Sequence, residues 1–186
     1  MDDAIEVRPF AASSEYEAMV DYFLDGGDAF LRGMGVNVSN LPAREDWLGA
    51  VLADHELADR ERNRLYLAWL FDGKLVGHSS LSHIKYGDTA NCHLHLWQSP
   101  LRRSGHGSAF LTRSIDIYFE RFQLGTLASE PFAENLAPGA ALRKFGFRSV
   151  RRFRTIPSGL AFEQEVERFE VGRDEWFARR GETGSR

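Results

Sequence analysis

The sequence predicts a single α/β domain built on one mixed β-sheet, and three observations carry this prediction. The chain has 186 residues, which suits one domain with a sizeable core and is short for two. Apolar residues make up 43% and charged residues 27%, as is ordinary in globular proteins. After the N-terminal third, the pattern indicates three strands, a helix, a strand, a helix and two strands. This order builds one sheet with helices on its faces.

The N-terminal third is predicted to form a short strand followed by helices. Residues 4–10 alternate between apolar and charged side chains until a proline follows, a pattern that is typical of a short strand. Ser13 or Ser14 is the candidate cap of the first helix. Helices are predicted at 13–24, 28–34 and 43–58. These pieces precede the first long strand, so we expect a helical cap at about residues 13–60 over a site.

The rest of the chain opens with its clearest local feature, a hairpin at residues 64–84. Its two apolar runs are joined by Asp72-Gly73, a sequence typical of a type I′ turn. The later elements are predicted as a strand at 91–97, a helix at 107–122, a strand at 126–129, a helix at 135–144 closed by Gly146, and strands at 148–156 and 162–171. The domain is expected to span 1–178, followed by a flexible polar tail at 179–186.

Charge is distributed unevenly along the chain. Residues 1–60 carry 13 acidic against 4 basic side chains, while the remainder has a balance of +5 and the whole chain −4. No dominant basic face results, so a nucleic-acid partner is not expected. An acidic part beside a basic part suits a cationic substrate next to an anionic cofactor. Asp25, Asp28 and Glu45 are candidates to attract that cation, and helix-face or capping roles are the simpler alternative.

Cysteine content and hydropathy indicate the compartment. The single Cys92 cannot form an internal disulfide, and it is interpreted as a core residue. No stretch reaches the roughly 18 uncharged residues that span a bilayer, and the acidic N-terminus does not resemble a signal peptide. We therefore expect a cytoplasmic protein with no membrane partner. No metal site is predicted.

The most informative segment, Arg102 to Ser108, lies between a predicted strand and a predicted helix. Gly105 and Gly107 let backbone amides approach an anion closely, and the following helix adds the positive end of its dipole. Two neighbouring arginines add charged donors for phosphate. The segment is neither a Walker A loop nor a dinucleotide fingerprint. Taken alone, it is equally compatible with an ordinary strand–helix turn.

Two motifs together carry a resemblance to a family. Arg102-x-x-Gly105-x-Gly107 resembles the acyl-coenzyme A loop of the GNAT superfamily of N-acyltransferases. The segments 135–138 and 142–147 resemble that superfamily's Asn-x-x-Ala/Ser…Lys-x-Gly-Phe element. The resemblance covers roughly residues 5–171, and the C-terminal segment looks most like the Rim-type and aminoglycoside-acetylating branches.

This resemblance implies a GNAT-like fold, with a mostly antiparallel sheet, and an acetyl-coenzyme A (acetyl-CoA) cofactor. The cofactor would lie in a V-shaped cleft between two parallel central strands. Its pantetheine arm would run along the first of these strands and its pyrophosphate would lie on the glycine loop. The implied cofactor-binding residues are Leu96, Trp97, Gln98, Arg102, Arg103, Ser104, Gly105, His106, Gly107, Ser108 and Asn135.

The sequence departs from the family pattern at two places. Leu142 stands where the family often has a tyrosine that acts as general acid. Ser99 stands where a proline is usual, and Pro100 follows one residue late. The first departure leaves protonation of the leaving thiolate without an assigned residue.

Candidates for the general base come from the strand before the loop. His93, His95 and Trp97 alternate onto one strand face, and an imidazole with a pKa of about 6.5 is well suited to accept a proton at neutral pH. Arylalkylamine acetyltransferases of this superfamily carry a histidine pair on this strand, of which only the position of His93 matches. Glu130, at the end of the next strand, is the third catalytic candidate. Structural histidines and a surface carboxylate are the alternatives.

The function expected is acetyl transfer from acetyl-CoA to a primary amine of a small molecule or of a protein N-terminus, by direct attack with general-base assistance. Because Leu142 replaces the tyrosine that acts as general acid, a non-catalytic acyl-CoA sensor is an alternative hypothesis. A protein-interaction module that binds a basic partner through the acidic helices is a third hypothesis. A homodimer is also left open.

Overall fold

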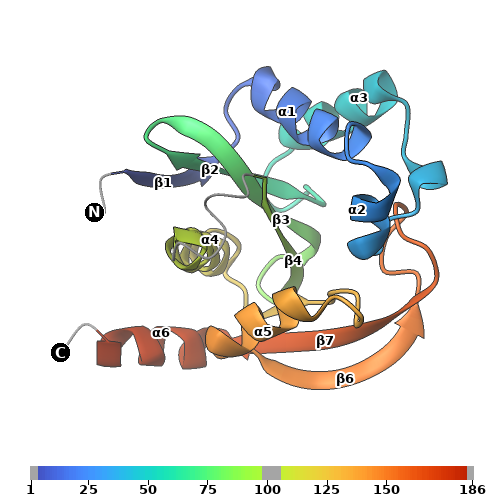
Figure 1. Cartoon of the computed structure of the whole chain (residues 1–186). Helices are drawn as coiled ribbons and strands as arrows, with labels where there is room; N and C mark the ends of the chain where they lie inside the picture. The colour runs from blue at the N-terminus through green and yellow to red at the C-terminus, as the bar shows by residue number, and fades with distance from the viewer. Residues whose placement is uncertain (1–3, 98–105, 184–186) are drawn as a thin grey trace.

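The structure, a computed structural model, describes residues 4–97 and 106–183 (Figure 1). The elements in chain order are β1 (Ile5–Pro9), α1 (Ser13–Leu24), α2 (Asp28–Gly33), the 3-10 turn η1 (Val38–Asn40), α3 (Arg44–His55), β2 (Leu65–Phe71), β3 (Lys74–Lys85), β4 (Thr89–Leu96), α4 (His106–Phe122), β5 (Thr126–Ser129), α5 (Leu136–Lys144), β6 (Arg148–Thr155), β7 (Gln164–Gly172) and α6 (Arg173–Thr183). The order of strands and α-helices matches the sequence prediction from β1 to β7, whereas α6 was not predicted.

All the strands named above join one sheet in the order β1-β2-β3-β4-β5-β7-β6. Neighbours are antiparallel except β4 and β5, which are parallel. The predicted single α/β domain with a mixed, mostly antiparallel sheet is therefore confirmed. The Asp72-Gly73 turn is also as predicted, because both residues have positive φ (49° and 72°), as a type I′ turn requires.

Helices cover both faces of the N-terminal half of the sheet (Figure 1). In β2, Leu65 and Leu67 pack in the core that contains α4, whereas Tyr66 and Ala68 face the core formed with α1, α2 and α3. Since successive strand residues point to opposite faces, both faces of β2 need apolar side chains. This explains its continuous apolar sequence and places α1 to α3 as a cap on one side.

The cap is attached to the far end of the sheet by hydrogen bonds. Gln164 Nε2 donates to the carbonyl of Gly35 at 2.8 Å, and the amide of Asn37 donates to the carbonyl of Leu160 at 2.8 Å. Gly35 has φ +83°, which a side chain would strain. The connection between β6 and β7 therefore holds the α2–η1 segment in place.

Several predicted boundaries are corrected. The cap residue of α1 is Ala12, not Ser13 or Ser14, and Glu15 binds back to the chain that precedes the helix. The third helix ends at His55, because Glu56 leaves the helix as its C-cap. The last helix reaches Thr183, so it extends into the segment predicted as a polar tail.

The last helix forms because it has an anchor. Trp176 is 3% exposed, and its indole donates a 2.8 Å hydrogen bond to Asp116 on α4. Cys92 is buried in the core as predicted, and burial raises the pKa of its thiol to about 12. In the described part of the chain, none of the helices combines the length and the apolar character needed to cross a bilayer.

Candidate functional site

β4 and β5 lie side by side over only a short stretch. Parallel pairing joins Thr89–Asn91 to Thr126–Ala128 and then stops, although β4 continues to Leu96. Where the strands part, the hydroxyl of Ser129 donates a 2.9 Å hydrogen bond to the carbonyl of Cys92. Beyond this bond, no strand of the described residues pairs with the β5 side of β4. This is the V-shaped opening expected between the two parallel central strands.

The backbone of β4 directs hydrogen-bonding groups into this opening. The amide of Trp97 donates to the carbonyl of Val76 on β3, and the carbonyl of Cys92 points the other way, toward β5. Because successive strand residues direct their backbone groups to opposite sides, those of Leu94 and Leu96 point into the opening. Amides and carbonyls along such an edge fit the amide groups of a pantetheine arm.

α4 begins within the predicted glycine loop, at His106. Its first turn contains His106, Gly107 and Ser108, and the first amides of a helix lack partners within the helix. A Cβ at Gly107 would meet no described atom within 4 Å, so an anion has room to approach this turn. These residues fit a pyrophosphate. The other predicted loop residues lie outside the described residues, namely Gln98, Arg102, Arg103, Ser104 and Gly105.

Asn135 lies directly before α5. Its amide donates to the carbonyl of Phe132 at 3.0 Å, and its side chain makes no capping hydrogen bond to the helix. The side chain is half-buried. It is therefore available to a ligand.

Imidazole and indole rings cluster on the cap-facing side of β3 and β4. His78 and His95 are cross-strand partners, and their rings stack 4.7 Å apart at 15°. The indole Nε1 of Trp97 donates a 3.0 Å hydrogen bond to Nδ1 of His78, which is 1% exposed. Nδ1 of His95 is buried without a partner among the described residues.

His78 was missed by sequence reasoning. The available signal was the register of the hairpin and the strand that follows it, which places His78 opposite His95. Without that register, a single histidine in an apolar strand does not stand out.

His93 lies on the same face of β4, further from the strand end. Its Nε2 lies 2.9 Å from the hydroxyl of Ser82, which is 3.1 Å from Nδ1 of His83. The structure therefore brings His93, His95 and Trp97 to one face, as the alternation predicts.

Burial lowers the pKa of these imidazoles. Desolvation, assisted by the charge of His83, lowers the pKa of His93 to about 4. Desolvation and the charge of His93 lower the pKa of His95 to about 3. The pKa of His78 also lies well below its usual range because of burial, with a smaller effect from the other two rings. All three are therefore neutral at neutral pH, and the expected ordinary pKa of about 6.5 is corrected downward.

Glu130 is engaged by an arginine. Its Oε1 lies 2.6 Å from Nη1 of Arg168, whose Nε is also 2.6 Å from Glu170. The Glu130 side chain is only 13% exposed. The carboxylate of Glu130 is therefore already engaged by the guanidinium of Arg168.

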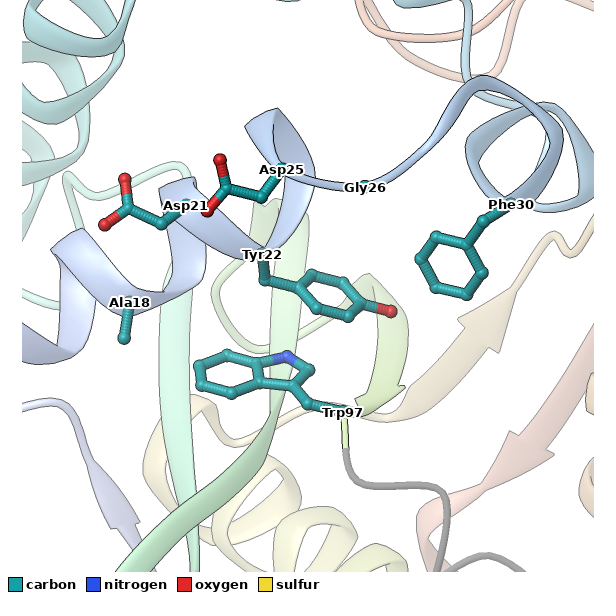
Figure 2. A pocket seen from close by; sticks show the side chains of 7 residues that line it. All are labelled: Ala18, Asp21, Tyr22, Asp25, Gly26, Phe30 and Trp97. Carbon is teal, nitrogen blue, oxygen red and sulfur yellow. The ribbon is translucent and has the colours of Figure 1, made fainter.

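A pocket of about 510 Å³ lies where α1 passes the end of β4. Ala18, Asp21 and Tyr22 line it from α1, Asp25 lines it from the C-cap of that helix, and Trp97 lines it from just beyond β4. Figure 2 shows the ring of Tyr22 lying over the indole of Trp97, with Phe30 beyond the hydroxyl of Tyr22. Of the three acidic residues proposed to attract a cation, only Asp25 lines this pocket. Asp28 and Glu45 lie in the first turns of α2 and α3.

The family follows from a comparison of the sequence with protein-family models. The model described as the acetyltransferase (GNAT) family matches residues 28–147, which is more than half of the chain. The chain belongs to the GNAT acetyltransferase family. The resemblance inferred from the two motifs is thereby confirmed, while the subfamily is not determined. GNAT enzymes use acetyl-CoA.

Solved GNAT structures share this fold at low sequence identity. One is RimL, a ribosomal L7/L12 alpha-N-protein acetyltransferase in complex with coenzyme A, with 17% identity and a TM-score of 0.73, covering 92% of this chain and 96% of that one. Another is spermidine N-acetyltransferase from Vibrio cholerae in complex with CoA and spermine, with 13% identity and a TM-score of 0.73, covering 94% and 99%.

A third neighbour is the ribosomal-protein-S5-alanine acetyltransferase from Vibrio fischeri, with 17% identity and a TM-score of 0.73, covering 93% and 95%. At identities this low, the structural similarity shows a shared fold and nothing more. Among curated proteins, none matches this GNAT chain in sequence.

The structure accounts for Leu142, which replaces the usual tyrosine of GNAT enzymes. Leu142 is 1% exposed and packs in the core with Phe147 and Phe169. The side chain at this position therefore faces the core, where a leucine contributes apolar contact and no proton.

Proposed function

We propose that this GNAT chain transfers an acetyl group from acetyl-CoA to the primary amine of an acceptor bound beside Trp97. The observation that carries this proposal is the opening between β4 and β5, which has backbone groups along one edge and the first turn of α4 at one end. The cluster of neutral imidazoles lies on the adjoining strand face.

The residues of the chain have separate tasks. Backbone groups of Leu94 and Leu96 bind and align the pantetheine amides, while the amides of Gly107 and Ser108 bind the pyrophosphate. Asn135 contacts the cofactor from α5. Acetyl-CoA would supply the thioester. The ammonium first loses one proton, and the nitrogen of the free amine then bonds to the acetyl carbon as the carbon–sulfur bond breaks. The nitrogen loses a second proton and the sulfur gains one.

Proton transfer is assigned to the histidine face. His95 has a buried Nδ1 with no partner among the described residues, so this atom can accept a hydrogen bond from the amine or from a bridging water. His93 is engaged with Ser82, and Glu130 with Arg168, so both need rearrangement before they accept a proton. We rank His95 first, and His93 and Glu130 remain candidates.

Leu142 favours a second candidate function, a non-catalytic acyl-CoA sensor, because no proton donor occupies that position. Both functions require the same cofactor site, so they differ only in turnover. The partner is accordingly an amine in the first case and a regulatory target in the second.

Calorimetry with acetyl-CoA tests the cofactor site. Gly107→Glu places a carboxylate at the first turn of α4, where open space accepts the side chain. We expect affinity to fall at least tenfold, since a negative charge there opposes an anion. Gly159→Glu is the matched control, because it also enters open space but in the β6–β7 connection. Equal affinity of wild type and Gly107→Glu would refute the assigned site.

A further inference from the structure

Three of the seven residues that line the pocket beside Trp97 are aromatic. Tyr22 and Trp97 stack with centroids 5.4 Å apart at 21°, and Tyr22 meets Phe30 edge-on at 5.8 Å. Phe30 is 38% exposed, one of the few large apolar side chains of the described residues that reach the surface to this extent. A ring or a short hydrocarbon chain would cover these faces and gain burial.

The charge of the pocket comes from one carboxylate. Asp21 is bound by Arg44 through two contacts of 2.7 and 3.2 Å, which neutralise it. Asp25 is exposed, and it forms no salt bridge within residues 4–97 and 106–183. Figure 2 shows the two carboxylates at the edge of the pocket, Asp21 on α1 and Asp25 at the C-cap of that helix. The pocket therefore complements a single positive charge next to an apolar body.

We propose that the acceptor is a monoamine with an aromatic or similarly sized apolar body, of the arylalkylamine class. This inference rests on the proposed acetyl transfer and names the substrate class of that site. The apolar body lies against Tyr22 and Phe30, and Asp25 attracts the protonated amine at the mouth of the pocket.

Two other amine classes fit less well. A polyamine brings several ammonium groups, but the pocket offers one carboxylate that is not already paired with an arginine. A peptide N-terminus brings backbone amides and carbonyls, whose burial needs partners. The side chains that line the pocket are rings, an alanine and the two carboxylates, and the hydroxyl of Tyr22 already contacts the sulfur of Met34 at 3.7 Å.

One residue that lines the pocket, Tyr22, also contacts the proposed proton acceptor. Tyr22 contacts Trp97 on one side and the ring of His95 on another, with centroids 5.8 Å apart in the second contact. Tyr22 is therefore the side chain that joins the pocket to His95. The neutral imidazoles there do not repel the incoming ammonium.

The test compares phenethylamine, spermidine and trialanine as acceptors at equal concentration. We expect kcat/KM for phenethylamine to exceed the other two at least tenfold. Asp25→Asn and Phe30→Ala should each raise its KM about tenfold with kcat little changed, as expected when a binding contact is removed. Added salt should raise KM in wild type and not in Asp25→Asn.

Matched variants control for general effects. Glu56→Gln removes an exposed charge from the same acidic third of the chain, and Leu57→Ala removes an apolar side chain that is also 38% exposed. Both should leave KM unchanged. A preference for spermidine or trialanine, or an equal effect of the control variants, would overturn the assignment of the acceptor class.

A binding measurement separates this proposal from the proposed function. Equilibrium dialysis of phenethylamine with the protein saturated by coenzyme A should show binding that Asp25→Asn weakens about tenfold. Binding without acetylation of any acceptor would refute acetyl transfer while supporting the pocket. Acetylation of spermidine or trialanine without binding of phenethylamine would refute the pocket while supporting acetyl transfer.

Discussion

The indole of Trp97, at the end of β4, donates its N–H to Nδ1 of His78 on β3. Because Nδ1 accepts this bond, the neutral His78 ring carries its own proton on Nε2. The stacked ring of His95 lies on one side of His78, and Tyr22 stacks on Trp97. One hydrogen bond between two strands thus fixes the ring that lines the acceptor pocket and supports the proposed proton acceptor.

A double-mutant cycle measures this bond. His78→Phe leaves a ring of similar size but removes the acceptor, and Trp97→Phe removes the donor. We expect the first variant to lower the free energy of unfolding by about 1–3 kcal/mol, and the pair to show a coupling of about 1 kcal/mol in urea titrations. Strict additivity of the two variants would mean that the bond contributes nothing.

The pH dependence of turnover follows from burial of the imidazoles. With pKa values of about 4 for His93 and about 3 for His95, neither ring gains a proton between pH 8 and pH 5. The acidic limb of kcat/KM that belongs to histidine should therefore lie below pH 5, and any limb above it should belong to the amine.

Profiles of wild type, His93→Ala, His95→Ala and Glu130→Gln check this assignment. We expect His95→Ala to lower kcat on the order of 10²-fold with the affinity for acetyl-CoA retained. A wild-type limb near pH 6.5 that disappears in His95→Ala would show that the ring titrates normally. Loss of turnover in Glu130→Gln alone would assign the base to the carboxylate.

Stability should also depend on the buried imidazoles. Their pKa values in the folded state lie below the unfolded value of about 6.5, so protonation favours the unfolded chain. Stability should be complete above pH 6.5 and fall progressively toward pH 3 to 4. Urea titrations at pH 7.5 and pH 5 should differ by about 1–2 kcal/mol for each of His93 and His95, and His78→Phe should reduce the total difference. An unchanged difference in His78→Phe would argue against this origin.

Gly77 is required by the approach of β3 to β4. A Cβ there would lie 2.5 Å from the carbonyl oxygen of His95. Gly77→Ala should therefore cost about 1–3 kcal/mol of stability and displace the end of β4. Gly49→Ala is the control on α3, where a Cβ meets nothing within 4 Å, and it should instead add about 0.5–1 kcal/mol. Thermal or urea unfolding of both variants decides the point, and equal stabilities would contradict it.

Local chemistry determined what the sequence could predict. The Asp72-Gly73 turn and the helix stop at Gly146 follow from residues that favour positive φ. Asp72, Gly73 and Gly146 all have positive φ in the structure. The cap of α1 was not predictable in this way. Glu15 is held by Arg8 from β1 at 2.7 Å and accepts the amide of Ala11 at 2.6 Å, so contacts with β1 decide where the helix begins.

The candidate site was predictable only where one strand carries it. Alternation along β4 brought His93, His95 and Trp97 to one face. His78 and Tyr22 come from other elements, and only the sheet register and the position of the cap bring them to that face. The low pKa values of the histidines depend on the same packing, which composition does not reveal.

The most direct test is to measure acetyl transfer itself. Mass spectrometry detects the acetylated acceptor, and a thiol assay measures the coenzyme A that is released. With wild-type protein, acetyl-CoA and phenethylamine, we predict one acetylated amine for each thiol released, and Gly107→Glu should need a higher acetyl-CoA concentration while Gly159→Glu behaves as wild type. Thiol release that is the same with and without every amine tested, and no acetylated product, would contradict acetyl transfer and leave only acyl-CoA binding.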